Sequence, residues 1–331
     1  MNNQPSSGYA AVKEIDVEAI PVIDVSGLFQ GKPDYAAVGH QLRSASENLG
    51  FFYVSHHCID TALMHQAFDI SKSFFANDEA LKEQVTVNQY HRGLLKVGVS
   101  KMEGQAKSDL KESFLWGIDV DESNEDFTAG NVMLPPNQWP EFLPEMRDVL
   151  NRYMAAAHHC GKQLLRAIAV SLDIDAEYFT GYFDKPVTRG SLIYYPHQPE
   201  SMGADQYGVS PHTDYGTMTI LAQDNTGGLR VRNRQGEWLT AHPIEGTLVV
   251  NVGDLLARWS NDRFKSTVHA VVNSSGQERY SIAIAMDPNW ETPIRPVVAE
   301  GEASHYEEVV CGEYIQGRFN RSFSYRKPAA S

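Results

Sequence analysis

The spacing of hydrophobic residues changes along the chain from a helical period to short β runs. A helical stripe from Val38 to Leu49 follows Asp34, a candidate N-cap, and a second helix is predicted after Asp60. Apolar residues also recur every three or four positions across 141–172, which predicts one long helix with a face on the core. We interpret His158 and His159 within it as structural, because adjacent residues on a helix point in different directions.

After Arg189 the pattern becomes a series of short β runs separated by Gly and Asp turns. Many short strands with such turns are typical of a sandwich or barrel, and a jelly roll fits their number. The predicted fold class is therefore α+β with a mainly β core, a double-stranded β-helix (jelly roll) with flanking helices. The predicted strands of this part are 191–195, 217–223, 229–232, 238–239, 247–252, 267–273 and 280–286.

The remaining segments divide the chain into two modules treated as one compact unit. We expect a loosely held arm over 1–18, strands at 20–25 and 51–54, a mobile loop followed by a strand within 86–118, and a helical tail over 304–319. Acidic and Pro-rich turn signals in 119–140 indicate an internal boundary. The predicted modules are an N-terminal α+β module over 19–130 and a jelly-roll core with its long helix over 140–320.

Composition excludes several classes of partner. The 28 Lys and Arg residues against 42 Asp and Glu leave a net charge of −14, which argues against nucleic acid and anionic membranes. Residues 1–10 are polar and lack the basic start and apolar run that are typical of a signal peptide, so we expect none. We also find no apolar run that approaches the length of a membrane helix. Three cysteines, widely spaced and odd in number, suit a reducing cytoplasm. These features predict a cytoplasmic protein. We also expect a monomer or homodimer that acts on a small molecule, although the charge balance itself says little about a small substrate.

His212 and Asp214 are the candidates for metal binding. Side chains two residues apart on a strand share one face, so a strand here would place the imidazole beside the carboxylate. His269 lies in another predicted strand, after about three intervening strands, and is the best candidate for a third ligand. Two histidines and one carboxylate form the ligand set of non-haem Fe(II) oxygenases.

A second pair with the same spacing is Arg279 and Ser281. An arginine fork beside a hydroxyl is suited to bidentate capture of a carboxylate. A salt bridge from Arg279 to one of the many acidic side chains explains the arginine equally well.

Together these motifs resemble the 2-oxoglutarate and Fe(II)-dependent oxygenases, in the branch similar to isopenicillin N synthase and the plant flavonoid and hormone dioxygenases. The likeness covers roughly 20–320. Besides the two pairs and His269, the segments that carry it are Tyr194-Tyr195-Pro196, Val249 to Asp254, Ile20 to Asp24 and Gly50-Phe51-Phe52.

The resemblance implies a function and a set of roles. His212, Asp214 and His269 would bind Fe(II), while Arg279, Ser281 and Tyr195 would hold 2-oxoglutarate as cosubstrate. The enzyme would use O2 to hydroxylate, desaturate or cyclise a small molecule with release of succinate and CO2, with ascorbate as a candidate stimulant. Two alternatives stay open: a 2-oxoglutarate-independent oxidase of the isopenicillin N synthase or aminocyclopropane carboxylate oxidase type, and a non-catalytic jelly-roll binding or sensor protein.

The resemblance also suggests where the substrate binds. Relatives place substrate contacts in the N-terminal part, and the tail could close the pocket as a lid through Phe319 and Tyr325. The candidate substrate residues are Tyr90, His91, Arg92, Phe114, Trp116 and Phe319.

Overall fold

The chain, described by a computed structural model over residues 20–323 and 325 except 101–106, 198–205 and 274, is built around a large, mostly antiparallel sheet. Eight strands pair in the order β1-β2-β10-β7-β12-β5-β4-β3, and only the β1–β2 pair is parallel. The arm expected over 1–18 lies outside the described residues. The strands of this sheet are β1 (Val22–Asp24), β2 (Phe51–Ser55), β3 (Gly93–Leu95), β4 (Glu112–Gly117), β5 (Arg189–Tyr195), β7 (Met218–Gln223), β10 (Thr247–Val252) and β12 (Arg279–Met286).

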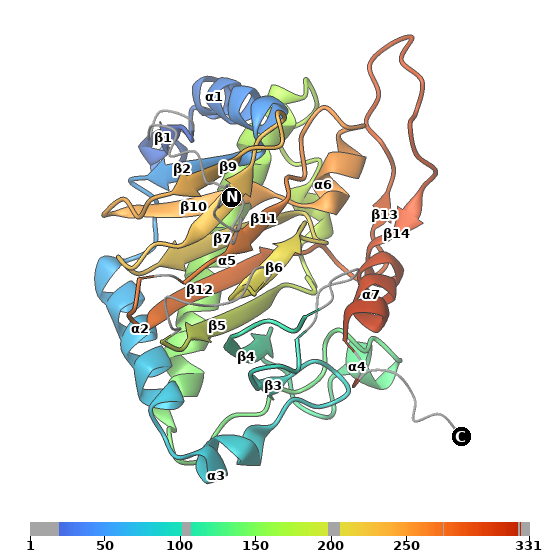
Figure 1. The fold of residues 1–331 in the computed structure, drawn as a ribbon. Coiled ribbons are helices and arrows are strands. Elements are labelled where there is room, and N and C mark those ends of the chain that lie inside the picture. Colours follow the sequence, from blue (N-terminus) through green and yellow to red (C-terminus); the bar gives the residue numbers. More distant parts are fainter. Residues whose placement is uncertain (1–19, 101–106, 198–205, 274, 324, 326–331) are drawn as a thin grey trace, which may run out of the picture.

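A smaller sheet faces the large one and completes the jelly roll. Its four strands pair in the order β6-β11-β8-β9, and a separate two-stranded ribbon lies next to the last helix (Figure 1). The predicted fold class is confirmed, and solved structures of similar fold agree with it. The strands are β6 (Val209–His212), β8 (Leu229–Arg232), β9 (Trp238–Ala241) and β11 (His269–Val271), with β13 (Pro293–Ile294) and β14 (Val309–Val310) in the ribbon.

Helices cover the outer face of the large sheet. The long helix α5 packs there on β12 and also contacts α1 and α2. Asp34 and Asp60 cap α1 and α2 as predicted, because their carboxylates accept hydrogen bonds from the Ala37 and Leu63 amides. The helices are α1 (Tyr35–Asn48), α2 (Thr61–Phe75), α3 (Glu79–Lys82), α4 (Glu125–Thr128), α5 (Glu145–Ser171), α6 (Asp254–Trp259) and α7 (Cys311–Ser322), with 3₁₀ turns at Ser26–Phe29, Glu83–Val85 and Thr180–Tyr182.

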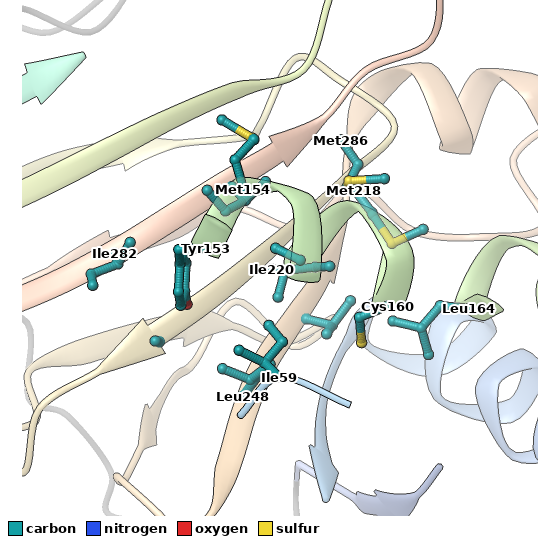
Figure 2. Packing of buried hydrophobic residues seen from close by; sticks show 14 of the residues in the cluster. Ile59, Tyr153, Met154, Cys160, Leu164, Met218, Ile220, Leu248, Ile282 and Met286 are labelled. Carbon is teal, nitrogen blue, oxygen red and sulfur yellow. The ribbon is translucent and has the colours of Figure 1, made fainter. Parts of the chain in front are cut away.

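The main hydrophobic core lies between these helices and the sheet. Figure 2 shows Tyr153 and Met154 of α5 beside side chains of the sheet such as Ile220 and Ile282. Each of these residues is at most 3% exposed. Because side chains alternate along a strand, the neighbours of Ile220 and Ile282 point to the opposite face, toward the smaller sheet. That inner face is where polar residues gather.

Several sequence-based boundaries need correction. The loop expected within 86–118 contains β3, a strand of three residues that is too short to leave a pattern. The segment after the predicted strand 247–252 is not one of the Gly and Asp turns, because α6 begins there, with Gly253 as its N-cap and Asp254 as its first residue. Four strands rather than about three separate Asp214 from His269. The tail helix starts only at Cys311, because the residues before it form β14.

The segment 119–140, predicted as a boundary, is tied to the long helix. The Asp119 carboxylate accepts hydrogen bonds from Trp139 and from Arg147 and Asn151 of α5. Strands from both sides of the segment share the large sheet. The division into two modules stays a prediction. None of the helices in the described part of the chain is long and apolar enough to cross a membrane.

His158 on α5 should make stability depend on pH. Its Nε2 is shielded from solvent and has no hydrogen-bond partner among the described residues. Burial, reinforced by the nearby Lys162 and His159, lowers the pKa of His158 from 6.5 to about 4. The unfolded chain therefore binds more protons between these values, and stability falls as the pH drops through this window.

Between about pH 7 and pH 5 the wild type should lose up to about 2 kcal/mol of its free energy of unfolding through His158. We expect His158→Gln to lack this part of the loss. Urea unfolding of both proteins across this range measures the difference. His159→Gln, at an exposed position of the same helix, is the matched control. An acid-induced loss that is the same in His158→Gln as in the wild type would contradict the assignment.

Candidate metal centre

A cavity of about 200 Å³ lies between the two sheets. The large sheet contributes alternate residues of β12, β5 and β7 to its lining, and the smaller sheet contributes residues of β6 and β11. Cavities lined by apolar side chains with a few polar groups commonly bind small organic molecules.

His212, Asp214 and His269 meet in this cavity. The two histidines are paired neighbours on β6 and β11, with ring centroids 4.3 Å apart. Asp214 Oδ1 lies 3.6 Å from His212 Nε2 and 3.7 Å from His269 Nε2. Each of the three residues offers one candidate ligand atom, and these three atoms lie within 4.8 Å of one another.

The route by which Asp214 reaches the histidines differs from the sequence-based argument. β6 ends at His212, so Asp214 does not share a strand face with it. It lies in the loop that follows, and α6 holds this loop: the amides of Asp254 and Leu255 donate to the carbonyls of Asp214 and Gly216 at 2.8 and 2.9 Å. Gly253 allows the approach, because a Cβ there would lie 2.2 Å from the Gly216 carbonyl oxygen.

Hydrogen bonds orient all three side chains toward a common point. The Nδ1 atoms of His212 and His269 lie 2.8 and 3.1 Å from the carbonyl oxygens of Ser210 and Thr267. Each Nδ1 therefore carries the proton, which leaves the Nε2 lone pairs facing the cavity. Two imidazole nitrogens and a carboxylate oxygen form a donor set that suits non-haem Fe(II).

The Asp214 carboxylate is held at its other oxygen. Oδ2 accepts hydrogen bonds from Thr219 Oγ1 at 2.5 Å and from Asn251 Nδ2 at 2.8 Å, while Oδ1 points toward the histidines. Burial opposes ionisation of Asp214, but His269, His212 and then Asn251 outweigh it and lower the pKa of Asp214 well below its usual range. Burial and the proximity of His212 lower the pKa of His269 to about 4, so this imidazole is neutral near pH 7.

Arg279 lies at one end of the cavity and is fully buried. Its guanidinium donates to the Gly227 carbonyl, to Ser281 Oγ at 3.2 Å and to Gln223 Oε1 at 3.3 Å. Within the described residues it has no acidic partner, so the salt-bridge explanation of Arg279 finds no support. A buried cation bonded only to neutral groups is suited to an anionic ligand.

Tyr195 packs beside this arginine. It is the cross-strand partner of Arg279, and the guanidinium carbon lies 4.7 Å from its ring centroid. Tyr195, Arg279 and Ser281 all belong to the cavity lining. The structure thus brings together Arg279, Ser281 and Tyr195, the three residues to which the family resemblance gives the cosubstrate.

The C-terminal helix covers another part of the cavity. Phe319 of this helix and Phe323 directly after it line the cavity, and His91 packs on both rings, with centroids 4.6 and 4.7 Å away. Tyr325 packs on His91 and hydrogen-bonds to its Nδ1. His91 and Phe319 are therefore cavity residues, whereas Tyr325 is not among the described residues of the lining.

Four other residues expected near a substrate lie elsewhere. The Tyr90 ring packs on Phe127, and buried Arg92 donates to the Met133 carbonyl at 2.9 Å. Phe114 and Trp116 face the helices, because the alternation along β4 turns Ser113 and Leu115 toward the cavity instead. None of the four is among the described residues that line the cavity.

Several residues that matter here carry no signal in the sequence. Thr219 and Asn251 support Asp214 from strands that could be identified, but only the sheet order places them beside it. Arg189 lines the cavity from the start of β5 and forms an ion pair with Asp287 at 2.8 Å. Asp287 is fully buried, and burial raises its pKa to about 6 against the opposing effect of Arg189.

Two family models match the chain. The model of the 2OG-Fe(II) oxygenase superfamily matches residues 190–288. The model described as the N-terminal part of non-haem dioxygenases in morphine synthesis matches residues 20–142. Every residue of the candidate metal centre falls within the first match.

Similar proteins extend over nearly the whole chain. A 2-oxoglutarate-Fe(II) type oxidoreductase of Emericella nidulans is 30% identical over 94% of this chain and 94% of its own length. A homoarginine-6-hydroxylase of Oryza sativa is 34% identical over 91% of this chain and 96% of its own. The crystal structure of a full-length Neurospora crassa protein in complex with alpha-KG matches with a TM-score of 0.80 and 31% identity, over 91% of this chain and 96% of that one.

The hydrogen bond from Asn251 to the Asp214 carboxylate should strengthen the binding of Fe(II). We expect Asn251→Ala to weaken binding of Fe(II) by roughly 10- to 100-fold, because the carboxylate loses a hydrogen bond that fixes its orientation. Anaerobic calorimetry with Fe(II) measures the change. Asn233→Ala, in a surface turn, is the control, and an unchanged affinity in Asn251→Ala would contradict this role.

Proposed function

Because the chain belongs to the 2-oxoglutarate–Fe(II) oxygenase superfamily, we propose that His212, Asp214 and His269 hold its iron and that Arg279, Ser281 and Tyr195 hold its cosubstrate. The protein is an Fe(II)- and 2-oxoglutarate-dependent oxygenase that oxidises a small molecule with release of succinate and CO2. The roles of the individual residues are our assignment.

One observation carries the assignment of the metal ligands. Asp214 Oδ1 lies 3.6 and 3.7 Å from the Nε2 atoms of His212 and His269, and the other polar atom of each side chain is hydrogen-bonded to the protein. The ligands are thus oriented before any metal arrives, which lowers the cost of binding it. Iron supplies O2 chemistry to the site when it is bound.

The assignment of the cosubstrate clamp rests on Arg279. Its buried charge faces the cavity without an acidic partner among the described residues, and Ser281 and Tyr195 flank it. A distal carboxylate would accept hydrogen bonds from this arginine and from Ser281. The clamp would then orient 2-oxoglutarate with its keto acid toward the metal ligands.

We further propose that the chain works in the cytoplasm as a monomer or homodimer and binds no nucleic acid. The net charge of −14 argues against binding of nucleic acid, and the three free cysteines are consistent with a reducing cytoplasm. We keep the modules 19–130 and 140–320 as one compact unit. Light scattering of the purified chain measures the assembly, and a tetramer or larger species would contradict the proposal.

The metal assignment predicts a spectroscopic signature. Anaerobic protein with Fe(II) and 2-oxoglutarate should develop the visible charge-transfer band of the chelate, and Asp214→Ala should lose both this band and Fe(II) binding. Asp148→Ala, which removes an exposed carboxylate on α5, is the control. A full band in Asp214→Ala would reject the ligand assignment. A rate of oxygen uptake that does not depend on 2-oxoglutarate would instead favour an oxidase of the same fold.

The clamp predicts a selective loss of cosubstrate affinity. Arg279→Ala should raise the Kd for 2-oxoglutarate by roughly 10- to 100-fold, the usual effect of removing a charged hydrogen bond, while Fe(II) binding persists. Calorimetry of each ligand separates the two effects. Arg152→Ala, an exposed arginine on α5, provides the comparison. Unchanged affinity for 2-oxoglutarate in Arg279→Ala would contradict the role of the clamp.

A further inference from the structure

Asp254, the first residue of α6, contacts the metal loop, which is the segment 213–217 between β6 and β7. Its Oδ2 accepts a hydrogen bond from Thr213 Oγ1 at 3.2 Å, and its amide donates to the Asp214 carbonyl at 2.8 Å. Thr213 lies between His212 and Asp214 in the chain. A single residue of α6 therefore holds both a side chain and the backbone of the turn that carries two proposed metal ligands.

The other oxygen of this carboxylate is bonded to the segment before His269. Oδ1 of Asp254 accepts a hydrogen bond from Ser266 Oγ at 2.6 Å. The next residue, Thr267, has the carbonyl that lies 3.1 Å from His269 Nδ1 and orients the imidazole. Asp254 thus contacts both segments from which the three proposed ligands project.

Helix α7 binds the same carboxylate. Arg318 Nη1 lies 2.7 Å from Asp254 Oδ2, and the two side chains are only 21% and 14% exposed, so water weakens this ion pair less than it would a surface pair. The guanidinium carbon also lies 4.2 Å from the ring centroid of Tyr215 in the metal loop. The Tyr215 hydroxyl is 2.6 Å from Ser322 Oγ at the end of α7. The helix is therefore joined to the metal loop at two places.

The position of α7 also determines how the cavity is covered. Phe319, which follows Arg318, lines the cavity and is buried, whereas neither Arg318 nor Asp254 is among the described residues of the lining. The two charged residues are thus placed outside the space that a ligand would fill. Any effect of theirs on the metal must pass through the residues that they hold.

A purely local role of Asp254 in α6 explains less. An acidic residue in the first turn favours a helix, and α6 has no hydrogen bond from an N-cap side chain. In the described part of the chain, however, the hydrogen-bond donors to the Asp254 carboxylate come from outside α6, namely from the metal loop, from the segment before His269 and from α7. The carboxylate connects these three segments.

We propose that Asp254 is a positioning residue for the metal centre and that Arg318 acts through it, so that docking of α7 strengthens the binding of Fe(II). Because coupling between two events is reciprocal, binding of Fe(II) in turn stabilises the docked helix. The inference rests on the proposed function, since it takes His212, Asp214 and His269 as the metal ligands.

The first test measures the affinity of the full-length protein for Fe(II) alone by anaerobic calorimetry. Arg318→Met should weaken binding by about 10-fold, and Arg318→Lys, which keeps the charge, should recover most of this loss. Arg321→Met, at an exposed position of the same helix, is the matched control and should bind as the wild type does. Unchanged Fe(II) affinity in Arg318→Met would overturn the inference.

A double-mutant cycle tests the path through Asp254. Asp254→Asn should weaken Fe(II) binding by roughly 10- to 100-fold, and Arg318→Met should add little in that background, because both changes break one contact. Where Asp254→Asn fails to fold, Ser266→Ala removes only the bond to Oδ1 and replaces it in the cycle. Losses that simply add would reject Asp254 as the link.

Hydrogen exchange tests the reverse direction. Fe(II) added to the wild type without oxygen should slow exchange of the α7 amides by up to the same factor of about 10, and Arg318→Met should lose this response. The amides of α2, on the outer face of the large sheet, should respond less. If Arg318 only secured the helix, its loss would lower protection equally with and without Fe(II), and this result would contradict the proposal.

The same measurements separate this inference from the proposed function. A wild type that binds Fe(II) while exchange of its α7 amides stays unchanged would refute the coupling alone. A wild type that does not bind Fe(II) would refute the proposed function itself.

Discussion

The structure depends on presenting one ionised carboxylate, that of Asp214, in a site largely removed from water. An isolated charge there would be costly, and a free side chain would rotate. The protein meets both difficulties by bonding Oδ2 to Thr219 and Asn251 and by placing Oδ1 beside two imidazoles. The backbone of the same loop is fixed by the first amides of α6. The geometry of the metal centre thus comes from β7, β10 and α6 as much as from the ligands.

Side chains alternate along the strands of the large sheet, so residues of the hydrophobic core lie on one face and residues of the cavity lie on the other. One face of β7 and β12 packs Ile220 and Ile282 against α5, while the other turns Thr219 and Ser281 toward the cavity. A hydrophobic core on one side therefore holds the polar residues on the other in register. The same alternation explains why Phe114 and Trp116 stabilise the core although their neighbours on β4 line the cavity.

The two arginines that line the cavity differ in their charged partners. Arg279 is buried with only neutral partners and suits a carboxylate, whereas Arg189 is already paired with the buried Asp287 carboxylate. The metal centre is level with Arg189, because Thr219, which donates to Asp214, pairs with Ala285, the cross-strand partner of Arg189. The two arginines have the same side chain, and their surroundings set their different roles.

Local signals in the sequence were enough to identify the candidate metal ligands, the Arg279–Ser281 pair, the caps at Asp34 and Asp60 and the jelly-roll class. These follow from spacing, turn residues and motifs, which act over a few residues. The same signals could not show that β6 ends at His212, that Asn251 supports Asp214, or that Arg189 rather than Trp116 enters the cavity. Those features depend on strand order and on which face of a strand meets the helices. They join residues that are far apart in the chain, so they are settled only when the sheets pair and pack.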